Sequence, residues 1–226
     1  MATASRAAPR QPGLRARLGR SPASQAAAWF GLNRTRARLA WAVVGAAALV
    51  SVAAAGCSSS PATVPSVHLL AARHAPSGWH SASLLGGRAV LAYPPGMRLV
   101  SGDRGTVSAA QFGASGAYMM YLNATPKQST ETLRNWPGFR IEHLKKESAV
   151  SAKLIAESRG VRFLGGTGTC VIDTYVTKIK SNHYTELACF VRGQNTASVI
   201  VAAAPTAKWA SVSPVLMRAV AAYQVG

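Results

Sequence analysis

The chain has 226 residues, with 25 lysines and arginines against seven acidic residues and a formal net charge of +18 at pH 7. Eight of the arginines and none of the acids fall within residues 1–38, so the remainder carries 17 basic and seven acidic residues, or +10. Basic residues never run longer than Lys145-Lys146, which excludes a polybasic arm. Their scatter is typical of a GC-rich genome, and a basic surface also suits anionic lipid or cell-wall polymers.

Residues 39–55 are an apolar run that follows three closely spaced arginines and ends at Ala54-Ala55-Gly56-Cys57. Arginines before an apolar segment stay on the cytoplasmic side while that segment enters the bilayer. The run is about 17 residues long, at the short edge of a spanning helix, which needs ~20. The small residues leave the chain open to a peptidase, and the thiol of Cys57 can accept a diacylglyceryl group.

Residues 34–57 resemble a bacterial lipoprotein signal. The resemblance implies that residues 1–56 are removed and that lipidated Cys57 holds the protein on the extracytoplasmic face of the cell membrane. The family usually has Leu where Ala54 stands here. An uncleaved anchor, or a secretory signal cut at an Ala-x-Ala site within 51–56, fits the same residues. Export excludes nucleic acid as a partner and leaves membrane lipid, an envelope protein, anionic lipid or a cell-wall polymer.

Residues 57–78 are rich in Ser, Pro and Ala and predict a flexible tether, so 79–226 form a single domain. If Cys57 is lipidated, Cys170 and Cys189 remain. In an oxidising compartment this pair predicts a disulfide. Two buried thiols are the alternative, and a metal pair lacks further ligands at suitable spacing. No pattern predicts a cofactor or a metal site.

The first half of the domain predicts short strands around a helix. The strands are expected at 88–93, 106–112 and 117–123. Ser129 opens a helix that Pro137-Gly138 interrupts and that 139–146 resumes. Segments 153–158 and 161–164 flank a turn at Arg159-Gly160, and a glycine-rich hairpin turn follows at 165–168.

Residues 170–179 and 183–191 alternate and predict two long strands. Cys170 and Cys189 fall on one face of this hairpin, and Asp173 and Glu186 on the other. A two-residue turn at Ser181-Asn182 would not set the cysteines opposite each other. A disulfide between opposed residues needs the turn centred on 179–180, or a bulge.

Residues 197–204 are apolar on both faces and predict a central strand. A terminal helix follows from Pro205-Thr206, with apolar residues at helical spacing. Pro214 lies inside this run, so the helix is expected to be two pieces or to begin at Pro214.

This order of elements is similar to the PsbP-like fold, which includes actinobacterial lipoproteins of the LpqN type. The resemblance covers residues 88–223 and implies an α+β domain, an antiparallel sheet with flanking helices in an α/β/α sandwich that ends in a C-terminal helix. A fold of this kind does not by itself determine a function.

The chemistry-bearing residues are few. Asp173 and Glu186 share a hairpin face and could do acid–base work, but a solvated strand face with Lys178 and Arg192 beside it is the commoner explanation. No nucleophile motif is present. We therefore expect a cell-envelope lipoprotein with a non-enzymatic binding or accessory domain. The alternative is a lipid-anchored hydrolase whose active site no motif identifies.

Overall fold

A computed structural model describes residues 70–147 and 149–226. Within them the chain forms a seven-stranded antiparallel sheet, in the order β3-β4-β5-β9-β8-β7-β6, and a three-stranded sheet, in the order β1-β2-β10. The strands are β1 His80–Leu84, β2 Ala89–Tyr93, β3 Arg98–Val100, β4 Val107–Phe112, β5 Tyr118–Pro126, β6 Ala149–Phe163, β7 Gly166–Thr177, β8 His183–Gly193, β9 Ala197–Pro205 and β10 Gln224–Val225. The helices are α1 Trp136–Glu147 and α2 Thr206–Ala221.

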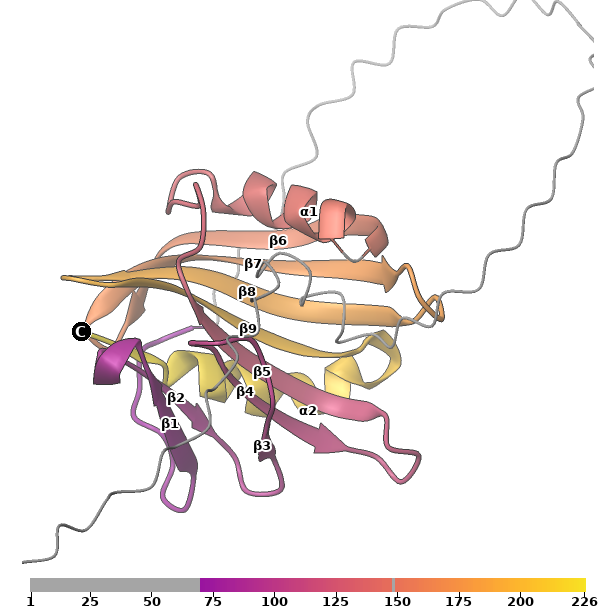
Figure 1. Ribbon diagram of the computed structural model, residues 1–226, viewed down its shortest axis with the longest axis horizontal. Coiled ribbons are helices and arrows are strands. Elements are labelled where there is room, and N and C mark those ends of the chain that lie inside the picture. The colour runs from indigo at the N-terminus through magenta and orange to yellow at the C-terminus, as the bar shows by residue number, and fades with distance from the viewer. Residues whose placement is uncertain (1–69, 148) are drawn as a thin grey trace, which may run out of the picture.

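The domain is α+β, and the two helices cover opposite faces of the large sheet (Figure 1). Alternation along the strands explains the two apolar layers. On β9, Ile200 and Ala202 pack toward α2, whereas Val199 and Val201 pack toward Trp136 of α1. The three-stranded sheet lies on the α2 side, where Leu91 joins the larger core.

The β7–β8 hairpin confirms the disulfide between Cys170 and Cys189. The two residues are directly opposed, with their Cα atoms 4.0 Å apart. Thr177 donates its backbone N–H to Asn182, so the loop is centred on residues 179–180, as an opposed pair requires, and not on Ser181-Asn182. Lys180 has a positive φ in this loop.

The expectation that 197–204 form a central strand is confirmed, because β9 lies between β5 and β8 in the middle of the sheet. A hairpin turn is present as predicted, but only Gly165 of the predicted segment 165–168 lies in it. The turn follows Phe163, and β7 already begins at Gly166.

Three predicted breaks are wrong. The predicted helix does not open at Ser129 but begins at Trp136, so Pro137-Gly138 do not interrupt it and lie in its first turn, where a missing N–H is tolerated. Arg159-Gly160 are not a turn between two strands, because β6 continues through them with a register shift between Ser158 and Val161. Pro214 neither begins nor divides the terminal helix, since α2 is continuous around it.

The sequence did not predict β1, β3 or β10. Residues 70–78, the end of the predicted tether, contact the domain: Leu70 packs against the larger core and Arg73 donates its backbone N–H to Ala221. Neither helix of the described residues is long and apolar enough to cross a membrane. The predicted signal peptide, Cys57 and the rest of the tether lie outside the described residues.

Candidate functional site

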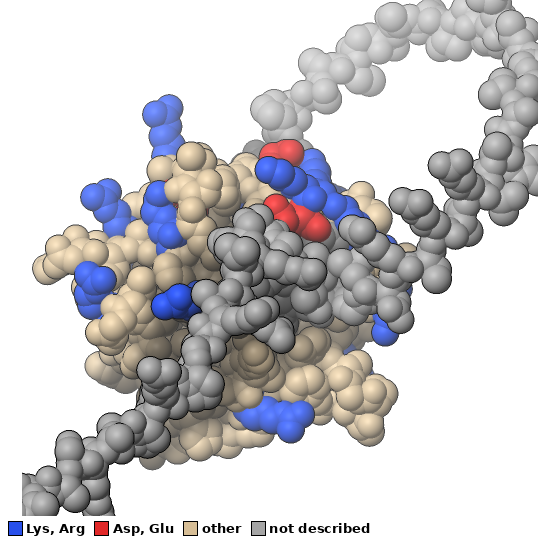
Figure 2. Space-filling view, viewed as in Figure 1, with Lys and Arg blue, Asp and Glu red and all other residues tan. Residues whose placement is uncertain are grey.

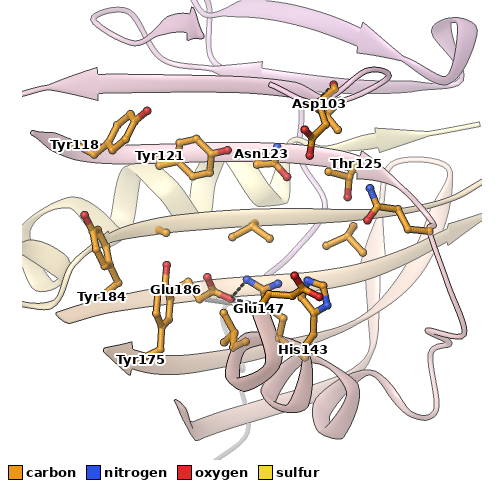
Figure 3. A pocket seen from close by; sticks show the side chains of 17 residues that line it. Asp103, Tyr118, Tyr121, Asn123, Thr125, His143, Glu147, Tyr175, Tyr184 and Glu186 are labelled. Carbon is orange, nitrogen blue, oxygen red and sulfur yellow. Dashed lines mark hydrogen bonds and ion pairs between the residues drawn. The ribbon is translucent and has the colours of Figure 1, made fainter. Parts of the chain in front are cut away.

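A cleft of about 240 Å³ opens on the α1 side of the large sheet, between α1 and β5 (Figure 3). Its lining is mainly polar and aromatic above a small apolar floor. The lining residues are Asp103, Thr106, Tyr118, Tyr121, Asn123, Thr125, Gln128, Arg140, His143, Leu144, Glu147, Tyr175, Tyr184, Glu186, Val199, Val201 and Ala203.

The register of the sheet explains why this face is hollow. Ala203 of β9 pairs with Tyr121 on one side and with Glu186 on the other, so a single methyl group separates two large polar side chains. Because neighbouring strands lie about 4.8 Å apart, Tyr121 and Glu186 stand roughly 10 Å from each other across that methyl. Val201 and Val199 extend the same shallow floor along β9.

Four of the six tyrosines of the chain line the cleft, in two pairs. Tyr175 and Tyr184 are opposed on β7 and β8 and stack with their ring centroids 5.7 Å apart. Tyr118 meets Tyr121 edge-on at 5.7 Å, because a register shift in the β4–β5 ladder brings both to one face. Burial raises the pKa of the Tyr121 hydroxyl to about 12, so this phenol is neutral at physiological pH.

The wall opposite β5 is held by a buried ion pair. Arg140 of α1 donates to Oε1 of Glu186, with Nε at 2.6 Å and a terminal nitrogen at 2.5 Å. The Glu186 side chain is 1% exposed and that of Arg140 is 13% exposed. Burial lowers the pKa of the guanidinium, but the neighbouring acidic groups, with Glu186 first among them, together outweigh burial and hold that pKa above its ordinary value.

Asp173 and Glu186 do share a hairpin face, and they are directly opposed. The interpretation of that face as solvated is wrong, because α1 covers it and Asp173 is fully buried. Within the described residues neither carboxyl oxygen of Asp173 has a hydrogen-bond partner. Burial, and then the charge of Glu186, raise the pKa of Asp173 to about 9, so this carboxyl is protonated at neutral pH.

Asp173 does not line the cleft; it lies on β7 beside Glu186, one strand further from β9. A protonated Asp173 can donate to the carboxylate of Glu186 across the ladder, while Arg140 holds the other side of that carboxylate. The three side chains therefore form a packed support for the cleft wall, and only Glu186 and Arg140 reach the open space.

The role of α1 as one wall of the cleft was not predicted from the sequence, although the spacing of its polar and aromatic residues indicates a single helix face. Trp136, Arg140, His143 and Glu147 follow each other at intervals of four, three and four residues, which is one face of an α-helix. Trp136 anchors that face, since its indole N–H donates to the backbone carbonyl of Ala188 at 3.0 Å. His143 stacks on Phe139, and burial together with Arg140 lowers the pKa of its imidazole.

Among the described residues no group of three or more His, Cys, Asp or Glu side chains could hold a metal ion. The cleft residues that the structure describes include no serine, cysteine or lysine, three of the residue types that act as covalent nucleophiles. The arrangement can donate and accept hydrogen bonds around a ligand that rests on the apolar floor.

No family model matches the chain, and no curated protein matches its sequence. The cyanobacterial PsbP (CyanoP) of Synechocystis sp. PCC 6803 is similar over 66% of this chain and 92% of its own, at 11% identity and a TM-score of 0.46. A protein from Bacteroides thetaiotaomicron VPI-5482 is 14% identical over 62% of this chain and 46% of its own, with a TM-score of 0.38. Protein PA94 of unknown function from Pseudomonas aeruginosa is 10% identical over 63% and 94%, with a TM-score of 0.36.

Proposed function

We propose that this chain is a lipid-anchored cell-envelope protein whose domain binds a small ligand in the cleft between α1 and β5. Lipidated Cys57 would tether it on the extracytoplasmic face of the membrane, close to an envelope protein, anionic lipid or cell-wall polymer. On the order of its elements, we also assign the domain to the PsbP-like class that includes the LpqN-type lipoproteins.

The single observation that carries the binding proposal is the shape and lining of the cleft. A floor of Val199, Val201 and Ala203 offers apolar contact, while Asn123, Thr125 and the tyrosines offer hydrogen bonds at the edge. Concave sites with an apolar surface and a few converging polar groups are typical of small-molecule binding.

The hydrolase alternative has less support from the same residues. Paired carboxylates catalyse when both reach the substrate, but Asp173 is fully buried and does not line the cleft. Glu186 in turn is held by Arg140 at 2.6 Å. This geometry favours a structural role for the acid pair and a binding role for the cleft.

The binding proposal is tested by filling the cleft. Protein extracted in a nonionic polyether detergent is titrated with methyl glucoside, benzoate and phenethylammonium at millimolar concentration, and amide NMR signals are followed. We expect at least one probe to shift the signals of Asn123 and Thr125. Ala203→Leu should abolish those shifts, whereas Ala210→Leu on the exposed face of α2 should leave them intact.

If none of these three probes, and neither of the cation and alcohol pairs described below, moves the cleft signals, the binding proposal is wrong. If the protein hydrolyses a nitrophenyl ester or glycoside and Ala203→Leu stops that hydrolysis, the hydrolase function replaces the binding proposal. Circular dichroism spectra of Ala203→Leu and Ala210→Leu show whether each variant is folded, so that a lost NMR shift can be attributed to the filled cleft and not to unfolding.

The anchor is tested separately. Replacing Cys57 with Ala and fractionating the cells should move the protein out of the acylated membrane fraction, because no other residue supplies the lipidated thiol. Ser58→Ala, next to it, is the matched control and should stay in the membrane. A Cys57→Ala protein that remains acylated and membrane-bound like its parent contradicts the lipoprotein assignment.

A further inference from the structure

We infer that the ligand of this cleft carries a positively charged nitrogen on a small apolar body, an alkylammonium compound. The inference rests on the proposed binding function and adds the chemical class of the ligand. It is carried by the charges, the tyrosines and the floor of the cleft.

Most of the charged residues that line the cleft are acidic, whereas the domain as a whole is basic. Residues 70–226 hold 17 lysines and arginines and seven acids, yet three of the acids and only one of the basic residues line the cleft. That base, Arg140, is already bonded to Glu186. Figure 2 shows basic side chains spread over the visible face, and the acidic side chains visible there lie close together with basic ones beside them.

The two other acids stand on opposite walls. Asp103 lies beside Asn123 and Thr125, and Glu147 lies beside His143 (Figure 3). Neither carboxylate takes part in an ion pair within residues 70–147 and 149–226. Because burial and the charge of Arg140 lower the pKa of His143, this imidazole is neutral at pH 7 and offsets neither of them. A bound ammonium ion would offset one of these two negative charges.

The tyrosines add a second attraction for a cation. The face of a phenol ring is electron-rich and attracts ammonium groups, by about 0.5–2 kcal/mol depending on exposure. The stacked pair of Tyr175 and Tyr184 and the edge-on pair of Tyr118 and Tyr121 supply four such rings around one space. The neutral Tyr121 hydroxyl shares a hydrogen bond with Ser108 at 3.2 Å, so the ring is what this residue contributes to the site.

The floor explains why an organic cation fits better than a metal ion or an anion. Val199, Val201 and Ala203 offer methyl groups, which favour the carbon skeleton of a ligand. A hard metal ion requires several oxygen ligands together. An anion would meet the carboxylates of Asp103, Glu147 and Glu186 with no unpaired base to compensate.

Choline and its neutral carbon isostere, 3,3-dimethylbutan-1-ol, separate charge from shape. Each is titrated against the detergent-extracted protein by NMR and calorimetry, with butylammonium and butan-1-ol as a second pair. We expect the cations to bind about tenfold or more tightly than their isosteres, as ring and carboxylate contacts together predict. The advantage should shrink as salt is added, because part of it is electrostatic.

Matched variants test whether the preference for cations arises from the acids of the cleft. Asp103→Asn and Glu147→Gln should each reduce the preference for the cation while leaving the alcohols unchanged. Glu142→Gln is the control on the same helix, since Glu142 pairs with Lys145 and does not line the cleft.

The possible failures are distinguishable. If the alcohols and the cations shift the cleft signals with equal affinity, or if the acid variants keep the full preference, the cation inference is wrong and the binding function stands. If neither pair and none of methyl glucoside, benzoate and phenethylammonium reaches the cleft, both proposals are wrong.

Discussion

Asp173 and Glu186 are opposed on neighbouring strands with no water-accessible surface on Asp173, so two carboxyl groups meet in the interior of the domain. Two negative charges on directly opposed residues would repel each other strongly in a medium of low dielectric constant. The pair is stable because Asp173 retains its proton and Arg140 neutralises Glu186. One proton and one guanidinium therefore determine whether α1 can cover this face of the sheet.

The protonated state of Asp173 makes stability dependent on pH. Its pKa is about 9 in the folded protein against the ordinary 3.8, so the folded state binds this proton more tightly. The stability that it contributes is complete below pH ~4 and is lost as pH rises toward ~9, at no more than about 1.4 kcal/mol per pH unit. Asp173→Asn, which keeps a donor but cannot ionise, should flatten the decline of melting temperature between pH 5 and 8.

Glu142→Gln provides the control for that experiment, because this exposed carboxylate lies on the outer side of α1. Its profile should follow the parent. A decline in the Asn variant as steep as in the parent would show that another group causes the pH dependence.

Arg140 is expected to contribute far more to stability than an exposed base on the same helix. Arg140→Met leaves Glu186 charged and buried without a partner, and breaking a buried pair in this way typically costs about 3–5 kcal/mol. Lys145→Met breaks the exposed pair with Glu142, which is worth at most about 1 kcal/mol. Urea unfolding measures both losses.

The double variant Arg140→Met, Glu186→Leu separates pairing from packing. Replacing both charges with apolar groups should recover much of the lost stability. If the double variant is as unstable as Arg140→Met alone, the loss arises from the packing of the arginine and not from an orphaned carboxylate.

The sequence predicted the β7–β8 hairpin well because alternation assigns every side chain to a face once the register is known. The two cysteines limited that register to a loop centred on 179–180 or a bulge, and the structure has the loop. The same reasoning placed Asp173 beside Glu186. Pro214 and Arg159-Gly160 misled the prediction, because long-range sheet and core contacts override a local breaker.

The cleft could not be predicted in the same way, because it depends on which strands are neighbours. Tyr121 and Glu186 are 65 positions apart, and only the insertion of β9 between β5 and β8 brings them to either side of Ala203. Burial of the acid pair required knowing that α1 packs on that face. Nothing in the alternation of one hairpin distinguishes a solvated face from one covered by a distant helix.

The disulfide should stabilise the domain without being essential to its fold. Cys170 and Cys189 are 19 positions apart, and closing a loop of this size contributes about 3 kcal/mol in the chain-entropy model. Cys170→Ala with Cys189→Ala should therefore lower the melting temperature by several degrees and leave the circular dichroism spectrum unchanged. Thiol titration of the denatured, unreduced Cys57→Ala protein should find no thiol, and two thiols per chain would contradict the bond.

Gly165 and Gly160 both have positive φ, +82° and +67°, but differ in what surrounds them. A Cβ atom on Gly165 would lie 1.8 Å from the carbonyl oxygen of Val225, whereas one on Gly160 meets nothing within 4 Å. Gly160→Ala should cost about 1–2 kcal/mol, the penalty of the left-handed region alone. Gly165→Ala should cost at least about twice as much, because it also displaces β10 from its place beside the hairpin.

Hydrogen exchange shows whether that displacement occurs. The amide of Val225 donates to Leu164 at 2.9 Å, so it should lose protection in Gly165→Ala and keep it in Gly160→Ala. Since β10 also pairs with β2, the loss should extend to the three-stranded sheet while the amides of β8 remain protected. Equal destabilisation by the two substitutions, with Val225 protected in both, would mean that the close approach of Gly165 to the C-terminal strand has no role in holding that strand.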